Sequence, residues 1–249
     1  MRRLILIFVM ACMPVLSVAG GGNGHKLDPV SIDLEDKVSL QRGATIFVNY
    51  CLSCHSAAYM RYNRLAKDLK FSDDPKESEK FVAKNMLFAA DKIGDLMKAA
   101  MPIEDAKDWF GVAPPDLTLL ARYRGPDWIY TYLRSFYLDE KSPSGWNNTV
   151  FENVAMPHVL YEWQGTQKAY FTKNEEGVKV FDRFEMIKSG TKSPQDFDKD
   201  MRDLTNFFVY LGEPSQLKRQ RVGWYVLLFL ALFLVVTYFL KKEYWKDVH

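Results

Sequence analysis

The chain has 249 residues, which is enough for one or two domains with a buried core. Hydrophobic residues make up 48 % and charged residues 26 %, which excludes a disordered or collagen-like chain. The formal net charge is +2, and Arg2 and Arg3 account for it, so the rest of the chain lacks the clustered positive charge that nucleic-acid binding requires.

The first twenty residues have the pattern of a secretory signal peptide. Two arginines precede an uncharged, mostly apolar run from Leu4 to Val18, and small residues stand at Ser17 and Ala19. The apolar run is shorter than the roughly 20 residues that span a bilayer. The alternatives are an uncleaved N-terminal anchor and a lipoprotein signal at Cys12. The pattern predicts a signal peptide over residues 1–19 and an exported domain over residues 20–218.

A helix is predicted over residues 40–50, directly before the two cysteines that remain after the signal peptide. Gly43, Phe47 and Tyr50 share one helix face at spacings of four and three. The cysteines then stand in the motif Cys51-Leu-Ser-Cys-His55. A disulfide, a zinc site and a thioredoxin-like redox pair are the alternatives for such a motif in an exported protein.

The histidine directly after the second cysteine decides between these alternatives. Zinc would need two further ligands at suitable spacing, and a thioredoxin-like pair does not need the adjoining histidine. When haem is attached covalently to a Cys-x-x-Cys-His motif, both thiols add to the haem vinyl groups and the adjoining imidazole binds the iron. The motif therefore predicts one covalently attached haem c, with Cys51 and Cys54 as thioether residues and His55 as iron ligand.

The ligand on the other face of the iron remains open at this stage. A methionine thioether is the usual partner in electron carriers because it favours ferrous iron. Met86 and Met97 fall in a stretch with helical character over residues 77–100, where methionine is more often core filler. Met101 and Met156 each precede a proline that would stiffen a ligand loop, and His158 stands nearby.

The segments between these motifs carry weaker signals. Acidic residues among lysines over 67–80 and 103–108 favour either a docking face for a basic electron carrier or an ordinary solvated face. Residues 139–148 predict a loop, and the turn Asn174–Gly177 predicts a short β-hairpin within residues 171–190. Leu204, Phe208 and Leu211 predict a helix over residues 201–211.

The C-terminal region predicts one transmembrane helix over residues 222–240. These residues carry no charge, and at about 1.5 Å per residue they cover roughly 28 Å, close to the hydrocarbon thickness. Three basic residues flank the span on each side, so charge gives no orientation. The signal peptide instead places residues 20–218 outside the cytoplasm and residues 241–249 inside it.

The chain resembles the cytochrome c1 family, the haem subunits of cytochrome bc1 (ubiquinol–cytochrome c reductase) complexes, in a bacterial form. The resemblance covers nearly the whole chain, and Pro-Pro-Asp-Leu and the junction before the span are its most specific motifs. It includes, in order, Gln41–Ser56, Tyr62–Leu65, Pro114–Arg124, Ala155–Pro157, Leu160–Tyr161, Tyr210–Pro214 and the basic run Lys218–Arg221.

This resemblance implies a mainly α fold: a c-type cytochrome domain with one C-terminal transmembrane anchor. It implies roles for Cys51, Cys54 and His55 as above, for Met156 as the second iron ligand and for Arg122 as partner of a haem propionate. Relatives often have a second proline where this chain has His158, whose side chain we expect to point away from the iron.

The implied function is electron transfer in the respiratory bc1 complex, from the Rieske iron–sulfur protein to cytochrome c. Cytochrome b and the Rieske protein would be partners in a dimeric complex of the bacterial inner membrane, with the haem domain in the periplasm. The subunit would not be an enzyme by itself. The alternatives are an anchored cytochrome that feeds another terminal oxidase or reductase, a peroxidase-like haem enzyme with an open sixth site, and a purely structural subunit.

Overall fold

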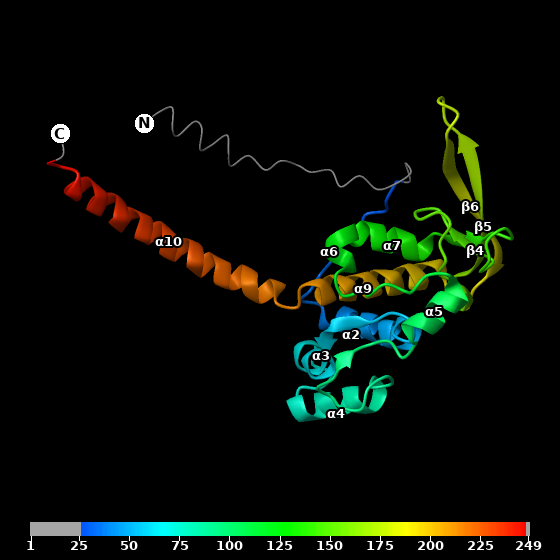
Figure 1. Ribbon diagram of the computed structural model, residues 1–249, viewed down its shortest axis with the longest axis horizontal. Coiled ribbons are helices and arrows are strands. Elements are labelled where there is room, and N and C mark those ends of the chain that lie inside the picture. Colours follow the sequence, from blue (N-terminus) through cyan, green and yellow to red (C-terminus); the bar gives the residue numbers. More distant parts are fainter. Residues whose placement is uncertain (1–25, 248–249) are drawn as a thin grey trace.

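The computed structural model describes residues 26–247 and is mainly helical. The predicted signal peptide lies outside the described residues. The helices are α2 (Lys37–Ile46), the π-helix η2 (Phe47–Cys51), α3 (Tyr62–Leu69), α4 (Pro75–Asn85), α5 (Ile103–Phe110), α6 (Leu120–Arg124), α7 (Pro126–Arg134), α8 (Tyr161–Gln164), α9 (Pro194–Gly212) and α10 (Gln216–Tyr244). Figure 1 shows α6 and α7 on one side of α9, and α2 and α3 on the other.

Three two-stranded antiparallel sheets surround the helical core. They pair β1 (Ala57–Arg61) with β2 (Leu96–Met97), β3 (Phe136–Leu138) with β4 (Trp146–Asn148), and β5 (Gly165–Lys173) with β6 (Lys179–Ser189). The third pair confirms the predicted hairpin, although it is longer than expected and projects from the body (Figure 1). The predicted loop over residues 139–148 is wrong for its last three residues, which form β4.

The core of the domain lies where α2 and η2 cross α9. Gly43 permits this close crossing, because a Cβ atom there would lie 2.2 Å from the carbonyl oxygen of Asp203. Phe47 packs against Phe207 and Phe208, with ring centroids 5.7 and 5.9 Å apart. The helices predicted over residues 40–50 and 201–211 are thus confirmed, and their apolar faces meet.

The helical character predicted over residues 77–100 ends at Asn85. Beyond it the chain returns to the segment after the cysteine motif: β2 pairs with β1, and the amide of Asn63 donates to the carbonyl of Ile93 at 2.7 Å. Met86 and Met97 are buried core residues, 2 % and 0 % exposed. Tertiary pairing therefore overrides a weak local preference for helix.

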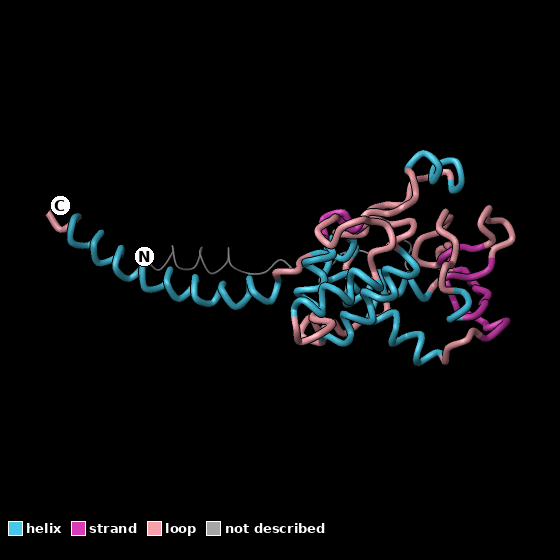
Figure 2. Tube along the Cα trace, turned by 90° about the horizontal axis from the view of Figure 1, so that it is seen from below, coloured by secondary structure: helices cyan, strands magenta, loops and turns pink. Residues whose placement is uncertain are grey.

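The helix α10 stands apart from the rest of the chain. Figure 2 shows it as an isolated rod that leaves one end of the domain. None of its residues is buried, and it contains the predicted span over residues 222–240. Among the described residues it is the helix whose length and composition suit a membrane crossing.

Candidate functional site

The cysteine motif follows the end of η2 in one closed turn. The amides of Cys54 and His55 both donate to the carbonyl of Cys51, at 3.1 and 2.8 Å. The five residues that lead into it, Phe47–Cys51, form the π-helix η2, which is a feature found often at functional sites. The turn brings both thiols and the imidazole to one cavity.

Neither cysteine forms a disulfide. The Cys51 thiol is buried and Cys54 is partly exposed. Burial, together with the neighbouring Cys54, raises the pKa of Cys51 to about 12, so this thiol is protonated at neutral pH. In the described part of the chain no group of three or more His, Cys, Asp or Glu side chains is placed so that it could hold a metal ion.

His55 is held by a backbone carbonyl from a distant segment. Its Nδ1 atom lies 2.8 Å from the carbonyl oxygen of Pro115. A carbonyl oxygen can only accept, so Nδ1 carries the proton and Nε2 keeps its lone pair. Burial lowers the pKa of His55, and this hydrogen bond raises it by a smaller amount. The net decrease in the pKa favours the neutral imidazole. Neutral imidazole with a fixed tautomer is the form that binds metals.

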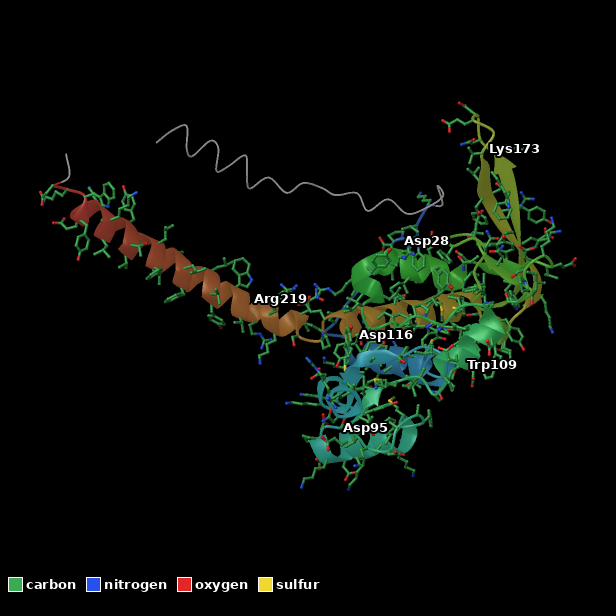
Figure 3. All side chains as sticks on the ribbon, viewed as in Figure 1. Asp28, Asp95, Trp109, Asp116, Lys173 and Arg219 are labelled. Atoms are coloured by element: carbon green, nitrogen blue, oxygen red, sulfur yellow. The ribbon has the colours of Figure 1, made fainter. Side chains whose placement is uncertain are left out.

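The Pro-Pro-Asp-Leu segment is in turn tied to the cysteine motif. Asp116, labelled in Figure 3, accepts from the amide of Ala58 at 2.7 Å and from that of Thr118 at 2.8 Å. The amide of Leu117 donates to the carbonyl of Ser56 at 2.8 Å. These bonds hold the Pro115 carbonyl against His55.

The cavity has a volume of about 430 Å³, within the range of small-molecule and cofactor sites. Its lining is mostly apolar. Besides Cys51, Cys54 and His55, it includes Tyr50, Phe110, Val112, Ala113, Pro114, Pro115, Leu117, Leu120, Arg124, Trp128, Tyr132, Leu133, Phe151, Val154, Ala155, Met156, Pro157, Val159 and Phe208.

Met156 reaches this cavity on a loop that two buried asparagines hold. The side-chain oxygen of Asn148 accepts from the amide of Val150 at 2.9 Å, and that of Asn147 accepts from the amide of Asn153 at 2.9 Å. The amide group of Asn148 donates to the carbonyl of Tyr132 at 2.8 Å. The sequence signal was present as the Asn-Asn pair before the loop, but its role as an anchor depends on tertiary contacts.

Tyr132 also contacts the methionine directly. Its hydroxyl donates to the Sδ atom of Met156 at 3.4 Å, and its ring stacks on Trp128 at 4.9 Å between centroids. Burial raises the pKa of Tyr132, so the hydroxyl keeps its proton. Nothing in the local sequence marks Tyr132 as a neighbour of residue 156, so this tyrosine was not among the predicted site residues.

The two arginines of α6 have different surroundings. Arg124 lines the cavity, and its guanidinium lies over the ring of Trp128, 4.8 Å from the centroid. Within the described residues it forms no ion pair. Arg122, the predicted propionate partner, does not line the cavity and points toward Glu213, and both arginines are exposed. Residues two apart on a helix are separated by about 200° around its axis, so the two side chains leave α6 in different directions.

The remaining candidates for the second iron ligand lie outside the cavity lining. Met101 is placed by a bond from its amide to the carbonyl of Ser53. The ring of His158 is buried, stacked on Phe136 at 4.9 Å and edge-on to Trp146 at 5.1 Å. Its Nε2 atom has no hydrogen-bond partner among the described residues. Burial lowers the pKa of His158 to about 4, so this imidazole is neutral.

These residues fit a covalently attached haem. Two free thiols, a neutral imidazole with its Nε2 lone pair available and a thioether share one apolar cavity. An arginine without a carboxylate partner among the described residues also lines it, as a buried propionate would require. The cavity thus contains one nitrogen donor, in His55, and one sulfur donor, in Met156, of the kinds that bind haem iron.

Comparisons with known proteins agree with this site. A family model described as the Cytochrome C1 family matches residues 31–248, a range that contains the whole cavity lining. A cytochrome c1 of Allochromatium vinosum is 51 % identical over 100 % of both chains. The ammonia monooxygenase gamma subunit of Nitrosomonas europaea is 46 % identical over 99 % of this chain and 100 % of its own. A cytochrome b/c1 of Bradyrhizobium diazoefficiens is 26 % identical over 86 % of this chain and 34 % of its own.

Proposed function

Because the chain belongs to the cytochrome c1 family, and is thus a haem electron-transfer subunit of a bc1 complex, we propose that it takes electrons from the Rieske protein and passes them to a cytochrome c. The observation that supports this most is one cavity shared by Cys51, Cys54, His55 and Met156. Its imidazole is oriented by Pro115, as an iron ligand would need to be.

Cys51 and Cys54 would hold one haem c by thioether bonds, and His55 and Met156 would be its iron ligands. When bound, the haem supplies one-electron chemistry as its iron alternates between ferric and ferrous states. The subunit makes and breaks no substrate bond, so by itself it is not an enzyme.

The chain contributes ligand positioning, a fixed charge and the exclusion of water. The Pro115 carbonyl orients the imidazole of His55, and the Tyr132 hydroxyl restrains the thioether of Met156. Arg124 would neutralise a propionate, since a guanidinium suits a carboxylate. The apolar lining keeps water from the iron, which favours the less charged ferrous state.

The proposed topology follows from both ends of the chain. Residues 1–19 would be removed as a signal peptide, residues 20–218 would lie in the periplasm, residues 222–240 would cross the inner membrane, and residues 241–249 would remain in the cytoplasm. The proposed partners are cytochrome b and the Rieske protein in a dimeric complex. The apolar, unburied helix α10 supports the proposed membrane crossing.

One relative favours an alternative acceptor. The Nitrosomonas europaea protein, 46 % identical to this chain, is named as a monooxygenase subunit. The alternative that this name supports is an anchored c-type cytochrome that feeds another terminal oxidase or reductase.

Purification of the membrane complex through an affinity tag at the C-terminus separates these functions. We expect a di-haem cytochrome b and an iron–sulfur protein to co-purify, and acid–acetone to leave the haem on this chain. Reduction of the complex by ubiquinol should reduce this haem through the iron–sulfur centre. Co-purification of an oxidase or reductase without cytochrome b would support the alternative, and extractable haem would contradict thioether attachment.

A further inference from the structure

The link between the haem domain and α10 is short, and backbone hydrogen bonds join it to the start of α10. It consists of Glu213, Pro214 and Ser215, between the end of α9 and the start of α10. The amide of Gln216 donates to the carbonyl of Glu213 at 3.0 Å, and the amide of Arg219 to that of Ser215 at 2.8 Å. Pro214 has a fixed φ angle and stiffens the link further. Figure 1 shows α10 leaving the domain beside the end of α9.

The carboxylate of Glu213 joins two elements across this link. Arg219, labelled in Figure 3 at the start of α10, donates to both of its oxygens, through Nη2 at 3.1 Å and through Nε. Arg122 of α6 approaches the same carboxylate at 3.9 Å. The group lies at the surface, with the side chains of Arg122 and Arg219 each 61 % exposed and that of Glu213 25 % exposed. Its bidentate geometry and shared carboxylate distinguish it from isolated surface ion pairs, which contribute little.

Gly212 makes room for Arg122. A Cβ atom on Gly212 would lie 3.1 Å from Cγ of Arg122 and 3.7 Å from the carbonyl oxygen of Thr118. The aliphatic part of the arginine therefore packs over the last residue of α9, and its guanidinium extends toward Glu213. A side chain at residue 212 would push this arginine aside.

A third contact comes from α3. The guanidinium of Arg64 donates to the Ser215 hydroxyl at 3.0 Å and to the carboxylate of Asp68 at 3.1 Å. Tyr210, in the last turn of α9, donates to the same carboxylate of Asp68 at 2.9 Å. The link therefore has a hydrogen bond from α3, an ion pair with α6 at 3.9 Å and backbone hydrogen bonds with the end of α9.

The charge at the start of α10 gives Glu213 a second role. The first turn of α10 contains no acidic residue, and Lys218, Arg219 and Arg221 stand in its first two turns. Positive charge at a helix N-terminus is unfavourable to the helix dipole. A carboxylate directly before that terminus offsets it, and its hydrogen bond with Arg219 lowers the pKa of Glu213, which keeps it ionised.

We propose that Arg64, Arg122, Glu213, Ser215 and Arg219 form a junction clamp that fixes the direction of α10 relative to the haem domain. The clamp holds the haem cavity at a constant height and tilt above the membrane, where partners anchored in the same membrane meet it. This inference rests on the proposed membrane anchoring of α10.

The test uses the full-length haem protein in its native membranes, with the variants Glu213→Gln and Arg64→Gln. Arg183→Gln is the matched control, because Arg183 forms an exposed ion pair with Asp182 on the hairpin, away from the junction. Trypsin cuts after Lys218, Arg219 and Arg221, and cleavage there releases the haem domain into the supernatant. Haem orientation is measured in parallel by electron paramagnetic resonance of oriented membrane layers.

We expect both junction variants to release the haem domain several-fold faster than the wild type and to broaden the spread of haem orientations. Their haem spectrum and midpoint potential should not change, and Arg183→Gln should match the wild type in every measurement. Unchanged release and orientation in Glu213→Gln would overturn the clamp.

Failure of the membrane anchoring gives a different result. A wild-type protein found in the soluble fraction would contradict the proposed topology and leave the contacts of the junction in place. Digestion of the same variants in detergent solution tests the clamp in that case. Equal cleavage rates there for the wild type and Glu213→Gln would again overturn it.

Discussion

Met156 is the thioether that lines the cavity, and its surroundings suit a fixed ligand. The asparagine-anchored loop and the Tyr132 hydroxyl restrain it, so little freedom is lost on binding iron. Met101, which also precedes a proline, does not line the cavity. The two methionines can therefore be separated by the same conservative substitution.

We expect Met156→Leu to retain the attached haem, to abolish the sulfur–iron charge-transfer absorption and to lower the midpoint potential, because the soft ligand that favours ferrous iron is lost. Met101→Leu should change neither, and its cost in stability should stay below roughly 1.5 kcal/mol, as for other volume-conserving swaps. Absorption and redox spectra of both variants check this. If the absorption band were lost in Met101→Leu and kept in Met156→Leu, Met101 would be the second iron ligand in place of Met156.

The charge of Arg124 should affect the midpoint potential of the haem. Its positive charge disfavours the ferric state, which has one more positive charge than the ferrous state. Arg124→Gln should therefore stabilise ferric iron and lower the midpoint potential, on the order of tens of millivolts for a partly screened unit charge. Redox titration of Arg124→Gln and Arg122→Gln compares them. A larger shift in Arg122→Gln would reverse their roles.

The crossing of α2 and α9 is the element contact on which the haem-binding turn depends. η2 continues directly from α2, so a displacement of α2 from α9 moves Cys51 as well. The approach at Gly43 leaves no space, and the nearest atom is a backbone oxygen that a side-chain rotation cannot move.

Gly43→Ala should destabilise the domain by about 1–3 kcal/mol, the usual cost of overpacking, and should reduce the yield of haem-loaded protein. Gly94→Ala is the control, since a Cβ atom there meets nothing within 4 Å. Thermal unfolding of the two proteins, followed by circular dichroism, measures the difference. Equal melting temperatures would show that α2 can shift on α9 without loss.

At the scale of the whole molecule, α10 adds length without adding to the core. None of its residues is buried, while the residues of α9 just before it belong to the hydrophobic core. A chain that stops after Arg221 keeps the junction clamp and loses only the apolar part of the helix. We expect this chain to be a soluble protein with an unchanged haem spectrum, recovered in the supernatant after cell fractionation. Loss of haem on truncation would mean that the helix is needed for folding.

Local patterns in the sequence predicted the haem-attachment motif, the membrane helix and the two helices that cross in the core. The Cys-x-x-Cys-His motif, the apolar C-terminal run and the helix faces over residues 40–50 and 201–211 are all signals between near neighbours, and the helices are where they were predicted. The resemblance to a family added Met156, which lies in the cavity lining, and Arg122, which does not.

Tertiary structure decided the questions that depend on residues far apart in the chain. Two methionines before prolines are equivalent locally, and only the folded loop brings one of them to Tyr132. The end of α4 at Asn85 follows from the pairing of β2 with β1, which no helical pattern contains. Arg122 and Arg124 differ by a rotation about α6, so their roles depend on which side of that helix faces the cavity. The sequence by itself determined which side chains are chemically suited to hold a haem, and packing between distant segments decided which of several similar ones line the cavity.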